Sequence, residues 1–219
     1  MDAVLAPLWR SEGAICLLDD RFPTVVSCMT SLRTLTEVDD SYQQLEDIEE
    51  RLTLEREALS RSRYLHGLTQ AALSKTISDH ELAPIATAVV RRGIRDRHRT
   101  GAQDRSGGHP GSPHILFVGR IERRKGVDTL LDAVGKLLED GIEAHLMLAG
   151  PITDPGFRAR FEQHVRHRPR FSEVVLPMGA VPDGELARLY ADADIVCLPS
   201  RYESHGIAPI EAMMFGKPI

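Results

Sequence analysis

Short apolar runs alternate with amphipathic stretches along the second half of the chain. The first run, 115–118, is closed by Gly119, as in a buried strand. Apolar residues then recur at helical spacing over 127–138, which predicts an amphipathic helix. By the same criteria we expect strands at 145–150, 174–179 and 195–198, and helices at 157–167, 183–190 and 207–215. This regular alternation predicts βαβ units around a parallel sheet, a Rossmann-like arrangement.

The first half of the chain carries a weaker pattern. Residues 41–63 predict one long helix whose many charges form a solvated face, together with Asp39 and Asp40 just before it. A short helical stretch is expected at 13–18, and strands at 4–6, 24–28, 64–68 and 88–90. Three or four strands are few for a doubly wound domain, so we expect this half to be cut short at its front.

Residues 95–113 separate the two halves. They lack apolar periodicity and are dense in glycine, proline, serine and charge, which is typical of a linker. The predicted fold class is α/β with two incomplete Rossmann-like lobes and parallel sheets. The lobes span 1–94 and 114–219, with the linker at 95–113.

Composition narrows the classes of function. The 219 residues hold 27 Lys and Arg against 32 Asp and Glu, a formal net charge of −5, which argues against nucleic-acid binding over a broad face. No run approaches the ~18 apolar residues that span a bilayer, and Asp2 stands where a signal peptide carries positive charge. Three cysteines at distant positions favour free structural thiols in a reducing compartment. We therefore expect a cytoplasmic protein.

The segment 119–126 is the first candidate for chemistry, because ligands of open parallel sheets gather beyond the carboxyl ends of the strands. Gly119 lets a ligand approach the backbone, and Arg120 and Lys125 bring two cations to a loop that leads into a helix N-terminus. That combination is typical of a phosphate or diphosphate site. The alternative is a basic surface turn.

The segment 199–212 is the second candidate. Glu203 lies beyond a strand end and Glu211 two turns into the helix that follows. Ser204, His205 and Gly206 place a small, uncharged helix start between them. Carboxylates can accept hydroxyls of a sugar while free amides hold its phosphate. The spacing of two glutamates is weak evidence by itself, and its value comes from the strand–loop–helix context.

Taken together, these segments resemble the nucleotide-sugar domain of family-four, GT-B-fold, retaining glycosyltransferases. The resemblance rests on Phe117-Val-Gly-Arg-Ile-Glu-Arg-Arg-Lys-Gly-Val127, on Pro199-Ser-Arg-Tyr-Glu203 followed by Glu211-Ala212, and on Gly216-Lys-Pro218. It covers 114–219, whereas 1–75 resembles the acceptor domain only loosely. It implies a fragment, truncated at both ends, of an enzyme that transfers a sugar from a nucleoside-diphosphate sugar to an acceptor hydroxyl with retention.

The resemblance also implies roles for individual residues. Arg120 and Lys125 would bind the donor diphosphate, and Glu203 would lie near the donor sugar, which makes these three the catalytic candidates. Glu211 would bind the ribose. The remaining substrate-binding candidates act through backbone and are Gly119, Val181, Ser204, His205, Gly206 and Ile207. Such transferases need no metal or other cofactor, so none is expected, and the donor sugar nucleotide and an acceptor are the expected partners.

One departure from the family leaves other functions open. The family commonly offers a histidine after the strand matching 24–28, where this chain has Met29-Thr-Ser31. The chain could therefore be a non-catalytic nucleotide-sugar-binding remnant, or another GT-B enzyme such as a sugar-nucleotide epimerase. The longer parent protein could also contact a membrane surface. His164 and His167 are spaced like metal ligands on a helix, but with no third ligand nearby a surface pair is favoured.

Overall fold

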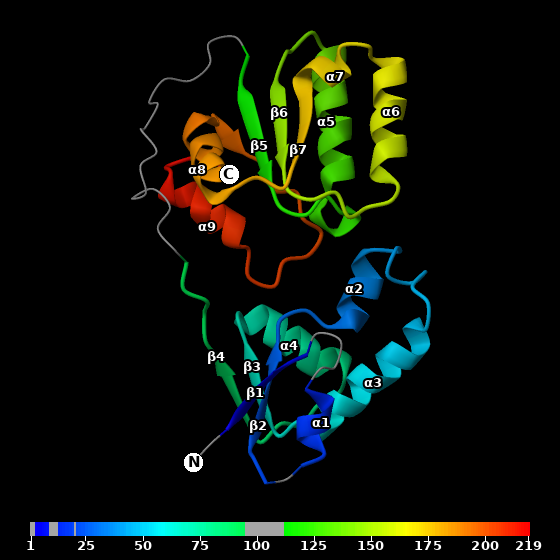
Figure 1. The fold of residues 1–219 in the computed structure, drawn as a ribbon, viewed down its shortest axis with the longest axis vertical. Coiled ribbons are helices and arrows are strands. Elements are labelled where there is room, and N and C mark those ends of the chain that lie inside the picture. The colour runs from blue at the N-terminus through cyan, green and yellow to red at the C-terminus, as the bar shows by residue number, and fades with distance from the viewer. Residues whose placement is uncertain (1–2, 9–12, 20, 95–111) are drawn as a thin grey trace. The chain divides into compact units, whose positions relative to one another are not determined.

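The computed structural model describes residues 3–8, 13–19, 21–94 and 112–219 (Figure 1). It contains two compact units: the first ends at Gly93 and also includes Glu203–His205, and the second comprises Ile94–Tyr202 and Gly206–Ile219. Most of the segment predicted as a linker, 95–111, lies outside the described residues. Each unit is an α/β structure built on its own parallel sheet, which confirms the predicted fold class.

The first unit contains a four-stranded sheet in the order β1-β2-β3-β4, with every neighbouring pair parallel. Its core gathers apolar side chains of β2, β3, α3 and α4 and includes Val26, Leu59, Leu65 and Leu73. Its elements are β1 (Val4–Pro7), α1 (Ala14–Leu17), β2 (Thr24–Cys28), α2 (Leu32–Val38), α3 (Ile48–Arg61), β3 (Tyr64–Gly67), α4 (Gln70–Asp79) and β4 (Ala86–Val89).

Several predictions for this unit were wrong in detail. The long helix begins only at Ile48, because Asp47 adopts a left-handed conformation with φ of 60° that interrupts a helix. Helices α2 and α4 were not predicted. The charges around α3 are not all solvated: Glu55 is buried and accepts backbone N–H groups of Leu32 and Arg33, at 2.6 and 3.2 Å. Asp39 is also buried and accepts the hydroxyl of Ser41.

The second unit contains a four-stranded parallel sheet in the order β7-β6-β5-β8. Its elements are β5 (His114–Val118), a 3-10 turn at Arg123–Lys125, α5 (Val127–Glu139), β6 (His145–Ala149), α6 (Phe157–His167), α7 (Phe171–Val174), β7 (Val175–Gly179), α8 (Asp183–Asp192), β8 (Ile195–Val196) and α9 (Ile207–Met214). The predicted strand at 174–179 starts one residue later, because Val174 ends the unpredicted helix α7. The strand predicted at 195–198 pairs only through Ile195 and Val196.

Alternating side chains of the sheet supply two cores, one on each face. Phe117 and Leu148 pack with α5, α6 and α7, whereas Leu116 and Val196 pack with α8 and α9. Figure 1 shows α5 and α6 beside one face of this sheet and α8 and α9 beside the other. The arrangement is doubly wound, so the loops that follow its strands meet at one edge.

All three cysteines are free thiols in the structure. Cys28 lies in the core of the first unit, where burial, together with the nearby Glu55, raises the pKa of its thiol to about 12. Such a thiol stays protonated at neutral pH and packs as an apolar side chain. Within the described ranges, no helix has the length and apolar character needed to cross a bilayer.

Candidate functional site

The candidate site lies at the carboxyl edge of the second sheet. The loop after β5 contains Gly119–Gly126, and the loop after β8 leads through Pro199–Tyr202 toward α9. Their backbones are joined directly, because the N–H of Arg201 donates to the carbonyl oxygen of Arg124 at 2.8 Å. The structure thus brings the first predicted segment against the Pro199–Tyr202 part of the second.

Two glycines allow neighbouring loops at this edge to approach closely: Gly126 the loops after β5 and β8, and Gly150 the loops after β5 and β6. A Cβ atom on Gly126 would lie 1.9 Å from the carbonyl oxygen of Pro199, and one on Gly150 would lie 1.9 Å from the carbonyl oxygen of Gly119. Both also have positive φ angles, 71° for Gly126 and 150° for Gly150, which other residues rarely adopt. No other residue fits these two points without moving a loop.

The two predicted cations occupy different positions on the first loop. Arg120 follows Gly119 directly, and its side chain is 47% exposed. Lys125 ends the 3-10 turn before α5 and is half-buried; its Cε lies 3.9 Å from the position of a Cβ on Gly119. The Lys125 side chain therefore passes over Gly119, the residue that follows β5. Both cations lie in the loop between β5 and α5.

The sequence did not predict the contacts that two other arginines, Arg124 and Arg201, make near this edge. Arg124 is buried and donates from Nη2 to Oε1 of Glu122 at 2.5 Å and from Nη1 to the carbonyl oxygen of Tyr202 at 2.9 Å. Arg201 donates hydrogen bonds from both Nη atoms to the carboxylate of Asp128, at 2.8 and 2.9 Å. These contacts fasten the loop after β8 to the start of α5. The sequence of three consecutive cations, Arg123-Arg124-Lys125, does not indicate which side chain is buried.

The segment before α9 follows the predicted order of residues. Glu203 is exposed, and Ser204 and His205 are half-buried. Gly206 adopts a left-handed conformation with φ of 68° and directly precedes α9, whose first residue is Ile207. No side chain caps this helix at Gly206.

Glu211 lies in the second turn of α9 and is buried. The hydroxyl of Tyr190, from α8, donates to its Oε2 at 3.0 Å, while the Tyr190 ring stacks on Phe215 with centroids 5.3 Å apart. A buried carboxylate held in this way has a fixed direction. Val181, between β7 and α8, packs against the same apolar core as Tyr190.

The histidine pair on α6 is not arranged as a metal centre. His164 contacts Asp132 of α5 at 3.2 Å and stacks on Phe171, whereas Nδ1 of His167 contacts the carbonyl oxygen of Gln163. Across the part of the chain that the structure describes, no group of three histidine, cysteine or acidic side chains could hold a metal ion.

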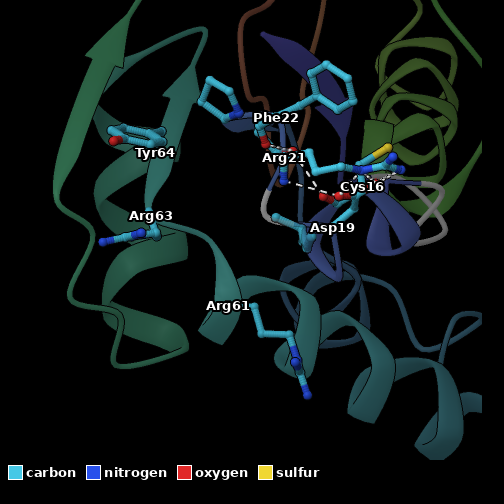
Figure 2. Close-up of a pocket in the computed structure, with 10 residues that line it drawn as sticks. Cys16, Asp19, Arg21, Phe22, Arg61, Arg63 and Tyr64 are labelled. Carbon is cyan, nitrogen blue, oxygen red and sulfur yellow. Dashed lines mark hydrogen bonds and ion pairs between the residues drawn. The ribbon is translucent and has the colours of Figure 1, made fainter.

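A separate hollow of about 360 Å³ lies in the first unit and is lined by residues at the starts of β2 and β3 (Figure 2). Two of its arginines form local ion pairs: Arg21 with Asp19 at 2.6 Å, and Arg61 with Glu57 at 3.0 Å. Figure 2 shows the guanidinium groups of Arg61 and Arg63 pointing away from the Arg21–Asp19 pair. The hollow is at the amino ends of the strands, opposite to the edge where ligands of parallel sheets bind.

Comparison with known protein families identifies the family of this chain. Residues 101–219 match the family described as glycosyl transferases group 1. The chain belongs to that family. The match includes both loops of the candidate site and the whole second sheet.

Individual relatives of this group 1 glycosyltransferase chain share a modest fraction of its sequence. It is 27% identical, over 219 residues, to D-inositol 3-phosphate glycosyltransferase of Segniliparus rotundus, a match that covers 96% of this chain and 48% of the relative. The chain thus spans about half the length of that curated relative.

Solved structures agree on the GT-B-like fold. Sucrose-phosphate synthase from Thermosynechococcus elongatus aligns with a TM-score of 0.73 at 22% identity, over 99% of this chain and 54% of that one. Anabaena Alr3699/HepE, solved with UDP and glucose, aligns with a TM-score of 0.69 at 19% identity, over 98% of this chain and 57% of that one. At such identities the likeness concerns the fold alone.

Proposed function

We propose that the chain forms the donor-binding part of a glycosyltransferase that moves a sugar from a nucleoside-diphosphate sugar to an acceptor hydroxyl, with retention at the anomeric carbon. One observation carries the proposal. The loop with Arg120 and Lys125 and the loop leading to Glu203 and α9 are fastened to each other at the carboxyl edge of one parallel sheet. Family membership supports transfer of a glycosyl group as the reaction.

In this proposal the diphosphate binds at the start of α5. Arg120 and Lys125 offset the negative charge that grows on the diphosphate as the bond to the sugar breaks, which stabilises the transition state electrostatically. An arginine fork and a lysine point charge suit phosphate oxygens, and the dipole of α5 adds to them. These groups supply the positive charge for which other transferases use a metal ion, so we expect no metal requirement.

The rest of the donor would lie along the second loop and α9. Backbone amides from Ser204 to Ile207, including those of His205 and Gly206, bind donor sugar and phosphate, with Glu203 beside the sugar. Glu211, held by Tyr190, accepts the ribose hydroxyls, and backbone around Val181 holds the base. Gly119 leaves room for the diphosphate next to the chain. Because the Anabaena protein of similar fold was solved with UDP, UDP is the first nucleotide to test.

A second candidate is a chain that binds the donor without transferring the sugar. The segment after β2 favours it, because Ser31 there is buried and uses its hydroxyl to cap α2, accepting from the N–H of Thr34 at 3.1 Å. No histidine occupies 29–31. Release of UDP from a UDP-sugar, measured with and without acceptor hydroxyl compounds, separates the two candidates.

Thermal melts with millimolar UDP, GDP or ADP test donor binding. A ligand at a hundredfold excess over its Kd stabilises the native state by about 2.7 kcal/mol, which raises the melting temperature by roughly 5–10 °C for a chain of this size. We expect such a shift for one nucleotide, its loss in Arg120→Ala, and its retention in Arg166→Ala. Arg166 is an exposed arginine of α6 and serves as the matched control. The same loss in both variants, or no shift with any nucleotide, contradicts the proposal.

A further inference from the structure

Glu122 and Arg124 form a buried ion pair inside the loop that follows β5. Each side chain is only 7% exposed, and their atoms Oε1 and Nη2 are 2.5 Å apart. The function proposed above assigns no role to either residue. Burial of two charges costs desolvation energy and is weak evidence for a gain in stability, so another reason for the pair is worth seeking.

Glu122 also contacts Arg120. The same atom, Oε1, lies 3.3 Å from Nη2 of Arg120. Arg120 is the more exposed of the two arginines that share Glu122, at 47% against 7%. One carboxylate oxygen therefore lies between a buried guanidinium and an exposed one.

The charges of this trio decide what a bound anion experiences. Two guanidinium groups and one carboxylate carry a net charge of +1. Arg124 lies closer to the carboxylate and is withdrawn from solvent, so it neutralises Glu122 and leaves the charge of Arg120 to act on a ligand. Without Arg124, Arg120 would be the only one of these two arginines left to neutralise Glu122, and the carboxylate would also repel an incoming phosphate.

We propose that Arg124 is a positioning residue that acts as the internal counter-ion of Glu122 and so keeps Arg120 available for the donor diphosphate. This rests on the proposed function, in which Arg120 binds the diphosphate. Arg124 acts through Glu122 and touches no donor atom. Its fork reaches the Tyr202 carbonyl as well, at 2.9 Å, so the counter-ion also fastens the second loop.

Isothermal titration of the purified chain with UDP, GDP, ADP and inorganic pyrophosphate tests the proposal. In Arg124→Met, the affinity for the nucleotide that binds best falls by about tenfold or more. Arg124 no longer neutralises the carboxylate of Glu122, so its negative charge weakens the binding of the phosphates. In the double variant Glu122→Gln/Arg124→Met the affinity returns to within about threefold of the original, because the carboxylate charge has also gone. Loss of packing alone would not be rescued in this way.

Two further variants provide controls. Arg123→Met removes one exposed cation from the same loop, and we expect less than about a threefold change because exposed charges are well screened. Arg124→Lys keeps the charge but loses the fork that also reaches Tyr202, and we expect its affinity to lie between those of Arg124→Met and the original chain. A cooperative melt of each variant without ligand establishes that it is folded. If Arg124→Met does not fold, the double variant, which buries no charge at this pair, still tests the idea.

The outcomes separate this inference from the function on which it rests. If the unmodified chain binds none of the four anions, the proposed function fails and the counter-ion role fails with it. If the chain binds and Arg120→Ala does not, the diphosphate site stands. In that case, full affinity in Arg124→Met, or a double variant as weak as that single variant, overturns the counter-ion role alone.

Discussion

Two helices of the first unit and two of the second, each following a parallel strand, begin in different ways. In the first unit, α2 and α4 follow Ser31 and Thr69, whose hydroxyl oxygens accept backbone N–H groups at 3.1 and 3.2 Å. In the second unit, α5 and α9 follow glycines in left-handed conformations that provide no side-chain cap. A capped helix start has already used its side chain to satisfy a free amide, whereas a glycine start leaves room for backbone or ligand to approach. The candidate site uses the second kind.

Gly126→Ala should have the largest effect on this comparison. Its Cβ would lie 1.9 Å from the Pro199 carbonyl oxygen at a φ of 71°, so we expect a loss of about 3 kcal/mol or more in the free energy of unfolding, together with loss of UDP binding. Gly141 has nearly the same φ, 75°, but an added Cβ there would meet nothing within 4 Å, so Gly141→Ala should cost only about 1–2 kcal/mol. Denaturant unfolding measures both, and equal losses would contradict the close-approach argument.

Tyr190→Phe should have the next largest effect. The ring still stacks on Phe215, but the hydroxyl that donates to Glu211 is gone, which should cost about 1–3 kcal/mol in stability because a buried carboxylate loses a donor. UDP affinity should fall as well. Tyr64→Phe is the control and should change stability by less than about 0.5 kcal/mol, because Tyr64 is only half-buried at the start of β3. Unchanged stability and affinity in Tyr190→Phe would remove Glu211 from the proposed ribose site.

Ser31→Ala examines the capped side of the comparison. Loss of the N-cap of α2 should cost about 1–2 kcal/mol in the free energy of unfolding, measured with urea. UDP affinity should stay unchanged, because this cap belongs to the structure of the first unit and has no role at the diphosphate. A drop in affinity without a drop in stability would place a ligand contact at the start of α2 instead.

The smallest effect concerns pH. Burial lowers the pKa of His164, and the nearby Asp132 opposes that shift only in part. A base with a lowered folded-state pKa favours its neutral form in the native state. Its contribution to stability is therefore present above its ordinary pKa of 6.5 and decreases as the pH falls through that value. Between pH 8 and 5 the chain should lose slightly more stability than His164→Gln, by less than about 1 kcal/mol. The opposite sign would show that Asp132 dominates.

The strands and helices with a clear apolar period were predictable from the sequence. The helix Phe157–His167 and the strand Thr24–Cys28 were predicted with their observed bounds. The missed helix α2 spans only seven residues, and it depends on a carboxylate from α3, Glu55, that lies 23 positions from Leu32. A contact of that kind exists only once the chain has folded.

The candidate site was predictable to a similar degree. The strand–loop–helix alternation located both loops, and the resemblance named Arg120, Lys125, Glu203 and Glu211. The pairing of Arg124 with Glu122 depends on the path of a 3-10 turn, and nothing in a run of three cations indicates it. The bond from Tyr190 to Glu211 joins residues of two helices, 21 positions apart, so it was equally hidden.

Mapping backbone amide resonances of the isotope-labelled chain during titration with UDP tests the central claim most directly. The account predicts that the largest shifts occur in Gly119–Gly126 and in Gly206–Glu211, with small shifts at the capped start of α2, Leu32–Thr34. The Arg120→Ala variant should lose the shifts in both loops together. Saturating UDP that moves Leu32–Thr34 most, or that leaves both loops of the second unit unperturbed, would contradict the account.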